Sequence, residues 1–152
     1  MATVNLSKSK DHKRFVSHFA AEWREVVFDA TQKALAQNDV AELIDVHAGE
    51  TVLRVDAQVL SADANAGTFD VGDGADADGY LDGIDAQQVG YNAMSPILAE
   101  GTPNSIAGYT AAGKFYAADD TIDLVALGVN GLTTAKIVLR ALVVPASRAK
   151  AA

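Results

Sequence analysis

The sequence contains no cysteine, only three prolines and few aromatic residues, which make up 7% of the chain. The absence of cysteine excludes disulfides, thiolate catalysis and zinc sites that need cysteine ligands. No apolar run approaches the roughly 20 residues that a membrane-spanning helix requires. The polar, basic N-terminus also differs from a secretory signal. With 152 residues, the chain is long enough for one domain with a hydrophobic core of its own.

Positive charge is missing from the middle of the chain, although the net charge is −8. Between Val55 and Gly113 there is no Lys or Arg, whereas nine acidic residues occur there. Such an acidic body repels phosphate backbones, so we expect the folded part not to bind nucleic acid. The first 33 residues are different, with six Lys or Arg against four acids. This basic head on an acidic body suits docking onto an acidic neighbour, or is simply a solvated tail.

Alternation of apolar and polar residues predicts β-strands over most of the chain after residue 40. The clearest segments are TVLRVDAQVL (residues 51–60) and TTAKIVLRALVV (residues 133–144), in which apolar side chains share one face. A short strand, Glu42–Val46, followed by the turn His47–Glu50, predicts a hairpin with the first of these segments. About eight short strands joined by Gly-rich turns indicate a β-sandwich or a barrel.

The pattern at residues 15–35 is ambiguous. Phe15, Phe19, Trp23 and Val26 lie at helical spacings, whereas alternation and β-branched content over residues 24–30 favour a strand. On pattern alone the helix is favoured. Around this segment we predict a flexible basic arm at residues 1–14, a sandwich domain at residues 15–146 and a frayed tail at residues 147–152.

The stretch FDVGDGADADGYLDG, Phe69 to Gly83, contains five aspartates and four glycines. A calcium loop needs oxygen ligands at alternate positions around a glycine. With that glycine at Gly79, four aspartates occupy ligand positions: Asp76, Asp78, Asp82 and Asp85. However, Gly74 stands where the first ligand belongs, and the flanks read as strands instead of helices. We therefore interpret the stretch as a solvated turn between strands that needs no metal, and a calcium-dependent binding module remains an alternative.

Catalytic patterns are weak in this sequence. His12, His18 and His47 show no metal-ligand spacing, and no nucleophile elbow is present. A pair of aspartates could serve a small glycan hydrolase, but the acids cluster with glycines and few aromatics are available to line a sugar site. We expect neither an enzyme nor a cofactor, so no catalytic, cofactor-binding or metal-ligating residue is assigned.

The order of segments resembles head cement or decoration proteins of tailed bacteriophages. The resemblance covers roughly residues 20–145 and is carried mainly by LIDVHAGETVLRVDAQVL and by TFDVGDG followed by DGYLDG. It implies an all-β fold, a single jelly-roll-like β-sandwich with an extended N-terminal arm. It also favours a strand instead of a helix at Ala20–Gln32.

The resemblance further implies a structural virion protein on the outer surface of a capsid, where it cements neighbouring copies of the major capsid protein. Such proteins are usually homotrimers near local three-fold axes. The basic arm would then contact acidic patches on the capsid, and the expected contact residues are Lys8, Lys10, Lys13 and Arg14. Neither nucleic acid nor a membrane is expected as a partner.

Overall fold

The computed structural model describes residues 21–93, 109 and 113–146, which form nine β-strands. Among these residues there is no helix that could cross a membrane. The strands are β1 Glu22–Asp29, β2 Val40–Val46, β3 Thr51–Ser61, β4 Thr68–Gly72, β5 Leu81–Asp85, β6 Gly90–Ala93, β7 Lys114–Phe115, β8 Asp120–Ala126 and β9 Lys136–Val144.

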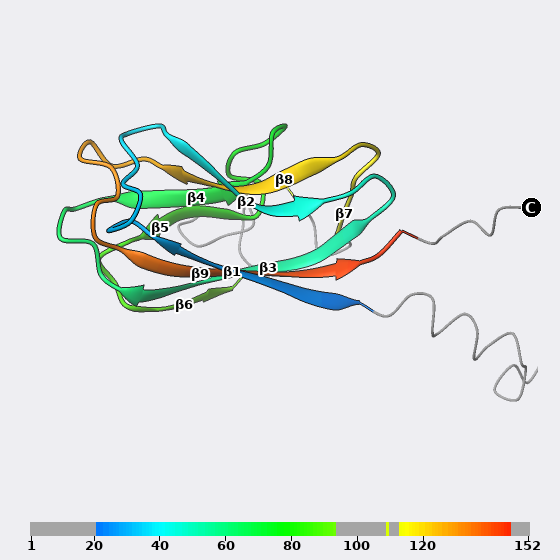
Figure 1. Cartoon of the computed structure of the whole chain (residues 1–152), viewed down its shortest axis with the longest axis horizontal. Helices are drawn as coiled ribbons and strands as arrows, with labels where there is room; N and C mark the ends of the chain where they lie inside the picture. Colours follow the sequence, from blue (N-terminus) through cyan, green and yellow to red (C-terminus); the bar gives the residue numbers. More distant parts are fainter. Residues whose placement is uncertain (1–20, 94–108, 110–112, 147–152) are drawn as a thin grey trace, which may run out of the picture.

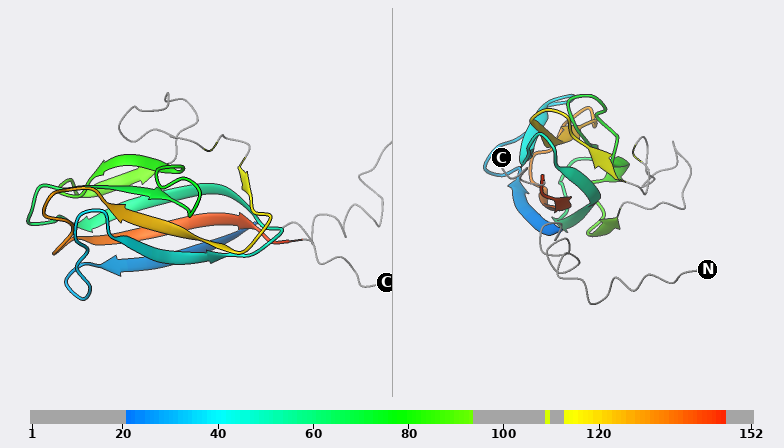
Figure 2. Two further views of the ribbon diagram at one scale, coloured as in Figure 1. Left: turned by 90° about the horizontal axis from the view of Figure 1, so that it is seen from above. Right: turned by 90° about the vertical axis from the view of Figure 1, so that its right-hand side faces the viewer.

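The strands form two antiparallel sheets that pack as a β-sandwich (Figure 1). One sheet has the order β1-β9-β3-β6, with the short β7 added beside β3, and the other has the order β2-β8-β4-β5. Consecutive strands pass from one sheet to the other at almost every connection, and β4–β5 is a hairpin within one sheet. This alternation is the topology of a jelly roll. Figure 2 shows the two layers from above and from one end.

The core between the sheets is built from aliphatic side chains of alternating strand positions. In β9, five residues at every second position are fully buried: Ala135, just before the strand, and then Ile137, Leu139, Ala141 and Val143. In β8, the fully buried residues Ile122, Leu124 and Ala126 follow the same rule. The shared apolar face read from residues 133–144 therefore predicted the core face of β9 correctly.

The first described segment is a strand, so the helix favoured by the periodicity is wrong for residues 22–29. β1 pairs with β9 along its whole length, from Glu22 opposite Val143 to Asp29 opposite Lys136, without a register shift. Only Phe28 is buried, whereas Trp23 and Val27 are exposed. An edge strand with one half-covered face carries apolar residues on both sides, and such a pattern imitates helical spacing. The arm at residues 1–14 and the tail at residues 147–152 lie outside the described residues.

The predicted hairpin between Glu42–Val46 and Thr51–Leu60 is also wrong. Both strands exist, but β2 pairs with β8 in one sheet and β3 pairs with β9 in the other. The turn at residues 47–50, in which Gly49 has a φ of 88°, carries the chain between the sheets. A register shift between Val52 and Arg54 then places Val52 in the core and leaves Leu53 half-buried. Alternation alone cannot distinguish a hairpin from a crossing between sheets.

A buried carboxylate joins the loops at the end of the sandwich away from this turn. Asp63, which is 4% exposed, accepts hydrogen bonds at Oδ2 from three consecutive amides, those of Thr133, Thr134 and Ala135, at 2.7–2.9 Å. Its Oδ1 accepts from the amide of Asn65 at 2.9 Å. Burial alone would raise the pKa of Asp63, but these amides outweigh burial and hold the pKa below its usual value.

We expect Asp63→Ala to lower the free energy of unfolding by about 2 kcal/mol or more, because several buried amides lose their acceptor. The folded pKa lies below the unfolded value, so this contribution is present at neutral pH and is lost as the pH falls below about 4. Urea unfolding at several pH values measures both effects. The exposed Asp85→Ala is the control, and an equal loss in the two variants would contradict the assigned role.

Candidate functional site

The β2-β8-β4-β5 sheet carries negative charge without compensation. Its strands contain no Lys or Arg. They contain seven acidic residues, which together we call the acidic face: Glu42, Asp45, Asp70, Asp82, Asp85, Asp120 and Asp123. Burial, and beyond it the charges of Glu42, Asp120 and Asp73, raise the pKa of Asp123, although Thr121 donates a hydrogen bond to it. The acids of this sheet therefore repel one another.

A depression of about 390 Å³ lies at one end of the acidic face, between β2 and the start of β8. Its lining includes four carboxylates, from Glu42, Asp45, Asp119 and Asp120, together with His47 and Thr121. The His47 ring lies 3.9 Å from Asp119, and both side chains are mostly exposed. This contact is a surface ion pair when the imidazole is protonated, which is worth little in stability. The depression is an anionic concavity that suits a cationic partner.

The aspartate-rich turn between β4 and β5 was predicted to be solvated, but its central residue is buried. Asp73 is 4% exposed and accepts hydrogen bonds from the hydroxyls of Tyr109 at 2.6 Å and Tyr116 at 2.7 Å. The Tyr116 hydroxyl also lies 2.6 Å from that of Tyr80, which is fully buried. Lys114 Nζ lies 3.6 Å from Asp73, so the carboxylate also has a basic partner. We call these five residues the tyrosine cluster.

The tyrosine cluster accounts for a charged Asp and a Gly side by side where β4 ends. Burial alone would raise the pKa of Asp73, but hydrogen bonds from the two hydroxyls and from the amides of Ala75 and Asp76 hold the pKa below its usual value. The turn is so tight that a Cβ on Gly72 would lie 2.0 Å from the carbonyl oxygen of Asp76. Tyr109 and Tyr116 follow Asp73 by 36 and 43 residues, so the contact cannot be predicted from the residues next to Asp73.

Three carboxylates of the same region lie within 4.8 Å of one another: those of Asp70, Asp78 and Asp82. The sequence alignment to a calcium loop included Asp78 and Asp82 but not Asp70, and the fold does not bring Asp76 or Asp85 into this group. Burial, followed by the charges of Asp82 and Asp78, raises the pKa of Asp70 to about 6, although the amide of Gly83 donates to it. Three oxygen ligands at this spacing could hold a hard divalent cation.

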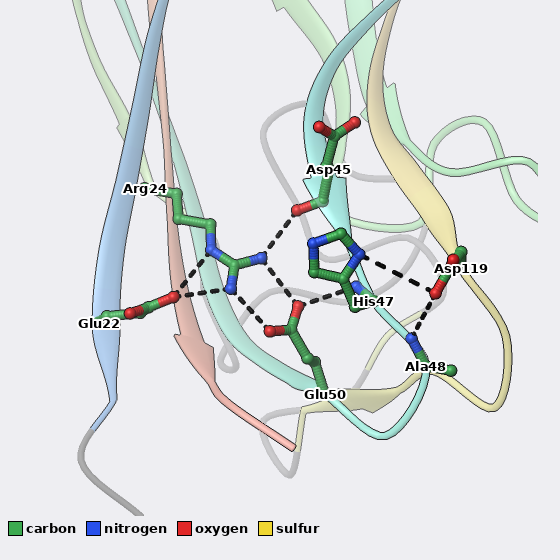
Figure 3. A network of polar contacts seen from close by, with 7 residues as sticks. All are labelled: Glu22, Arg24, Asp45, His47, Ala48, Glu50 and Asp119. Atoms are coloured by element: carbon green, nitrogen blue, oxygen red, sulfur yellow. Dashed lines mark hydrogen bonds and ion pairs between the residues drawn. The ribbon is translucent and has the colours of Figure 1, made fainter. Parts of the chain in front are cut away.

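A second polar network joins the edge strands β1 and β2 across the open side of the sandwich (Figure 3). Arg24 binds both oxygens of Glu50, which is 5% exposed, at 2.7 and 2.8 Å, and it donates to the backbone oxygen of Asp45 at 2.8 Å. Glu50 also accepts from the amide of His47. The hydrogen bonds with Glu50 raise the pKa of Arg24, which is therefore always charged. This network fixes where the chain enters the fold.

The outer face of the β1-β9-β3-β6 sheet differs from the acidic face, because its charges are neutralised within the sheet. Arg140 pairs with Glu25 at 2.5 Å and donates to Gln58 at 3.2 Å. Asp56 is only 2% exposed, and its carboxylate accepts hydrogen bonds from Arg54 and Tyr91. Large apolar side chains also remain exposed here, including Trp23, Val27 and Tyr91, at 51–54%. Arg and aromatic residues are typical of protein interfaces.

This arrangement defines a jelly-roll β-sandwich with one acidic sheet and one charge-balanced sheet. Two solved structures share the fold. A chain of the acidic stable capsid structure of Helicobacter pylori bacteriophage KHP30 superposes with a TM-score of 0.57 at 13% identity, over 86% of this chain and 91% of that chain. A chain of the cyanophage Pam1 capsid asymmetric unit gives 0.52 at 17% identity, over 83% and 84%. No family model and no curated protein matches the sequence.

The structure leaves the predicted arm residues untested. Lys8, Lys10, Lys13 and Arg14 lie outside the described residues, as do His12 and His18. The features that sequence reasoning missed are the depression beside β2, the tyrosine cluster and the Arg24 network. Each is assembled from strands and loops that are distant in sequence. The run without Lys or Arg was the one visible signal, since it covers β4, β5 and β6.

We expect Asp73→Asn to destabilise the fold by about 2 kcal/mol, since a buried, charged acceptor of two hydroxyls is lost. Tyr116→Phe removes one donor and should cost about 1 kcal/mol. Thermal and urea unfolding measure both values. Asp85→Asn, at an exposed position on the neighbouring strand, is the matched control. Unfolding of Asp73→Asn at the wild-type midpoint would show that the tyrosine cluster contributes no stability.

Proposed function

We propose that the protein is a non-enzymatic structural component of a phage virion, which binds the outside of the capsid and cements neighbouring major capsid subunits. The observation that carries this proposal is the fold shared with chains from two phage capsid structures, over more than four fifths of each chain. The segment order that resembles cement proteins points to the same role. One fold can serve many functions, so the proposed capsid contact also depends on the chemistry of the protein surface.

The two unlike faces fit a protein that lies flat on a shell. The charge-balanced face, with Trp23, Val27 and Tyr91 exposed, offers the aromatic and Arg-containing surface that protein contacts favour. The acidic face would then point to solvent and keep the coat soluble. A ligand that binds only the assembled state stabilises that state by mass action, and many copies acting together need only a modest interface each.

The basic arm is the second part of the proposal. Lys8, Lys10, Lys13 and Arg14 precede the sandwich and would reach an acidic surface of a neighbouring subunit on the shell. A homotrimer near a local three-fold axis, as in the resembling proteins, would bury sandwich edges that otherwise invite non-native pairing. β1 is the edge most in need of such cover, because it is eight residues long and pairs with β9 without a bulge.

The test uses virions of the phage that encodes the chain and shells purified without this protein. We expect the protein in purified virions, and the full chain should sediment with the shells and raise the temperature at which they come apart. Deletion of residues 1–14 should weaken shell binding at least about tenfold, the loss expected when about 1.4 kcal/mol of contact energy is removed. Absence of the chain from virions would reject the function, whereas unchanged binding of the truncated chain would reject only the role of the arm.

A calcium-dependent binding module, for example for cell-surface carbohydrate, is the second candidate, and the Asp70–Asp78–Asp82 group is the observation that favours it. Calorimetric titration of the full chain with calcium decides whether the group binds the ion. If it does, calcium should raise the melting temperature, and Asp82→Asn should abolish both the heat and the shift. If the titration gives no heat and no shift, this candidate fails, and the virion proposal is unaffected.

A further inference from the structure

The edge of β1 that faces away from β9 pairs with no described strand. In the ladder with β9, the amide of Ala30 donates to the oxygen of Ala135 at 2.9 Å, and hydrogen-bonded pairs recur at every second residue from there. The even-numbered residues of β1 therefore direct their backbone groups toward β9, and the odd-numbered residues direct theirs outward. The amides and carbonyl groups of Trp23, Glu25 and Val27 consequently face the open side of the strand.

The other strands at the ends of the two sheets have features that discourage pairing with another chain. β6 and β5 are short, with four and five residues. β2 has a register shift between Glu42 and Ile44, which interrupts its ladder with β8. In contrast, β1 has eight residues and no register shift, and it exposes Trp23 and Val27. A long, regular edge with exposed apolar side chains is a template for a further strand, and among the described strands β1 alone has all of these properties.

The sequence of β1 is complementary to an antiparallel copy of itself in one register about a two-fold axis. An axis at Arg24 or at Glu25 would place that residue opposite the same residue of the second copy. An axis at Val27 would place Glu25 opposite Asp29. Like charges directly opposite each other are destabilising. Of the four central positions, Val26 is the one whose axis avoids this, since Glu25 then lies opposite Val27 of the second copy.

The axis position is also apolar and accessible from the open side of the sandwich. Val26 is half-buried against the core, and together with Leu43 it lines a depression of about 460 Å³ between β1 and β2. Because Val26 directs its backbone groups toward β9, the two Val26 residues would form a pair without hydrogen bonds, in which side chains approach closely. Glu25 needs no partner from the second copy, since Arg140 neutralises it within each sheet.

We propose that β1 pairs with β1 of a second copy of the protein, antiparallel and about a two-fold axis at Val26. The contact joins the two β1-β9-β3-β6 sheets into one continuous sheet and places the exposed Trp23 and Val27 of both copies along the seam. It is isologous, so it closes with two copies. The inference does not rest on the proposed function. It covers β1 by a two-fold contact, and a three-fold contact of the proposed homotrimer would then use other edges.

Because the chain has no cysteine, single cysteines introduced into the full-length protein test the register directly. In Val26→Cys, the two Cα atoms would lie about 4.5 Å apart, within the range that a disulfide spans. We expect a covalent dimer after mild oxidation, seen on a non-reducing gel. Val27→Cys is the matched control, because its two copies would be diagonal neighbours about 7–8 Å apart, too far for an unstrained disulfide. We expect the control to cross-link at least about tenfold more slowly.

A proline variant tests the same contact without a covalent bond. The amide of Val27 points away from β9, so Val27→Pro removes hydrogen bonds of the new contact and leaves the ladder within the sheet intact. Sedimentation over a range of concentrations should show self-association at least about tenfold weaker than that of the wild type. Raising NaCl from about 0.1 M to about 1 M should strengthen association of the wild type, because each copy carries a net charge of −8. Circular dichroism verifies the fold of each variant.

Two outcomes would overturn the inference. One is a Val26→Cys variant that cross-links no faster than Val27→Cys. The other is a Val27→Pro variant that self-associates as tightly as the wild type, as expected if copies meet through other edges or not at all. Shell binding, measured in parallel, separates these failures from failure of the proposed function. A protein that decorates shells without pairing through β1 would keep the virion role, and loss of shell binding in Val27→Pro without self-association of the wild type would assign β1 to a strand of the shell protein instead.

Discussion

Each sheet of the jelly roll must bury one side of every strand in a single shared layer, and this constraint organises the rest of the molecule. Because consecutive strands alternate between the sheets, nearly every loop crosses an end of the sandwich and carries backbone groups away from the strand ladders. Those groups need partners. Buried carboxylates accept hydrogen bonds from several of these amides: Asp63 at one end of the sandwich, and Asp73 and Glu50 at the other.

These buried carboxylates therefore have a structural role, because each holds loop groups in place by hydrogen bonds. Asp63 holds three consecutive amides of a distant loop, Asp73 holds two tyrosine hydroxyls, and Glu50 holds both a guanidinium and an amide. Each carboxylate is desolvated and remains ionised because its hydrogen bonds favour the charged form. A chain without cysteine, with few aromatic residues and much of its apolar content in Ala and Val, obtains rigidity at its loops from these polar contacts.

The sequence predicted those features that depend on neighbouring residues. The alternation in β3, β8 and β9 identified strands, and the Asp-Gly stretch identified the turn between β4 and β5. Features that depend on residues distant in sequence could not be predicted. The sequence of residues 47–50 is compatible both with a hairpin turn and with a crossing between the sheets. The burial of Asp73 depends on tyrosines 36 and 43 positions away, and the depression combines β2 with β8. β1 was ambiguous because an exposed edge strand lacks a clean polar face.

The two sheets differ in whether their carboxylates are paired with positive charge. On the β1-β9-β3-β6 sheet, the carboxylates of Glu25 and Asp56 are paired with guanidinium groups, whereas the opposite sheet leaves its carboxylates facing one another. Mutual repulsion disfavours the fold, and it adds to burial, the larger cause, in raising the pKa values of Asp70 and Asp123. Stability alone would favour a few lysines on β2 or β5, as on many edge strands. Their absence is physically coherent if the neutralising charge comes from outside the sandwich. A cationic surface of a partner molecule is the kind of source that would relieve this repulsion.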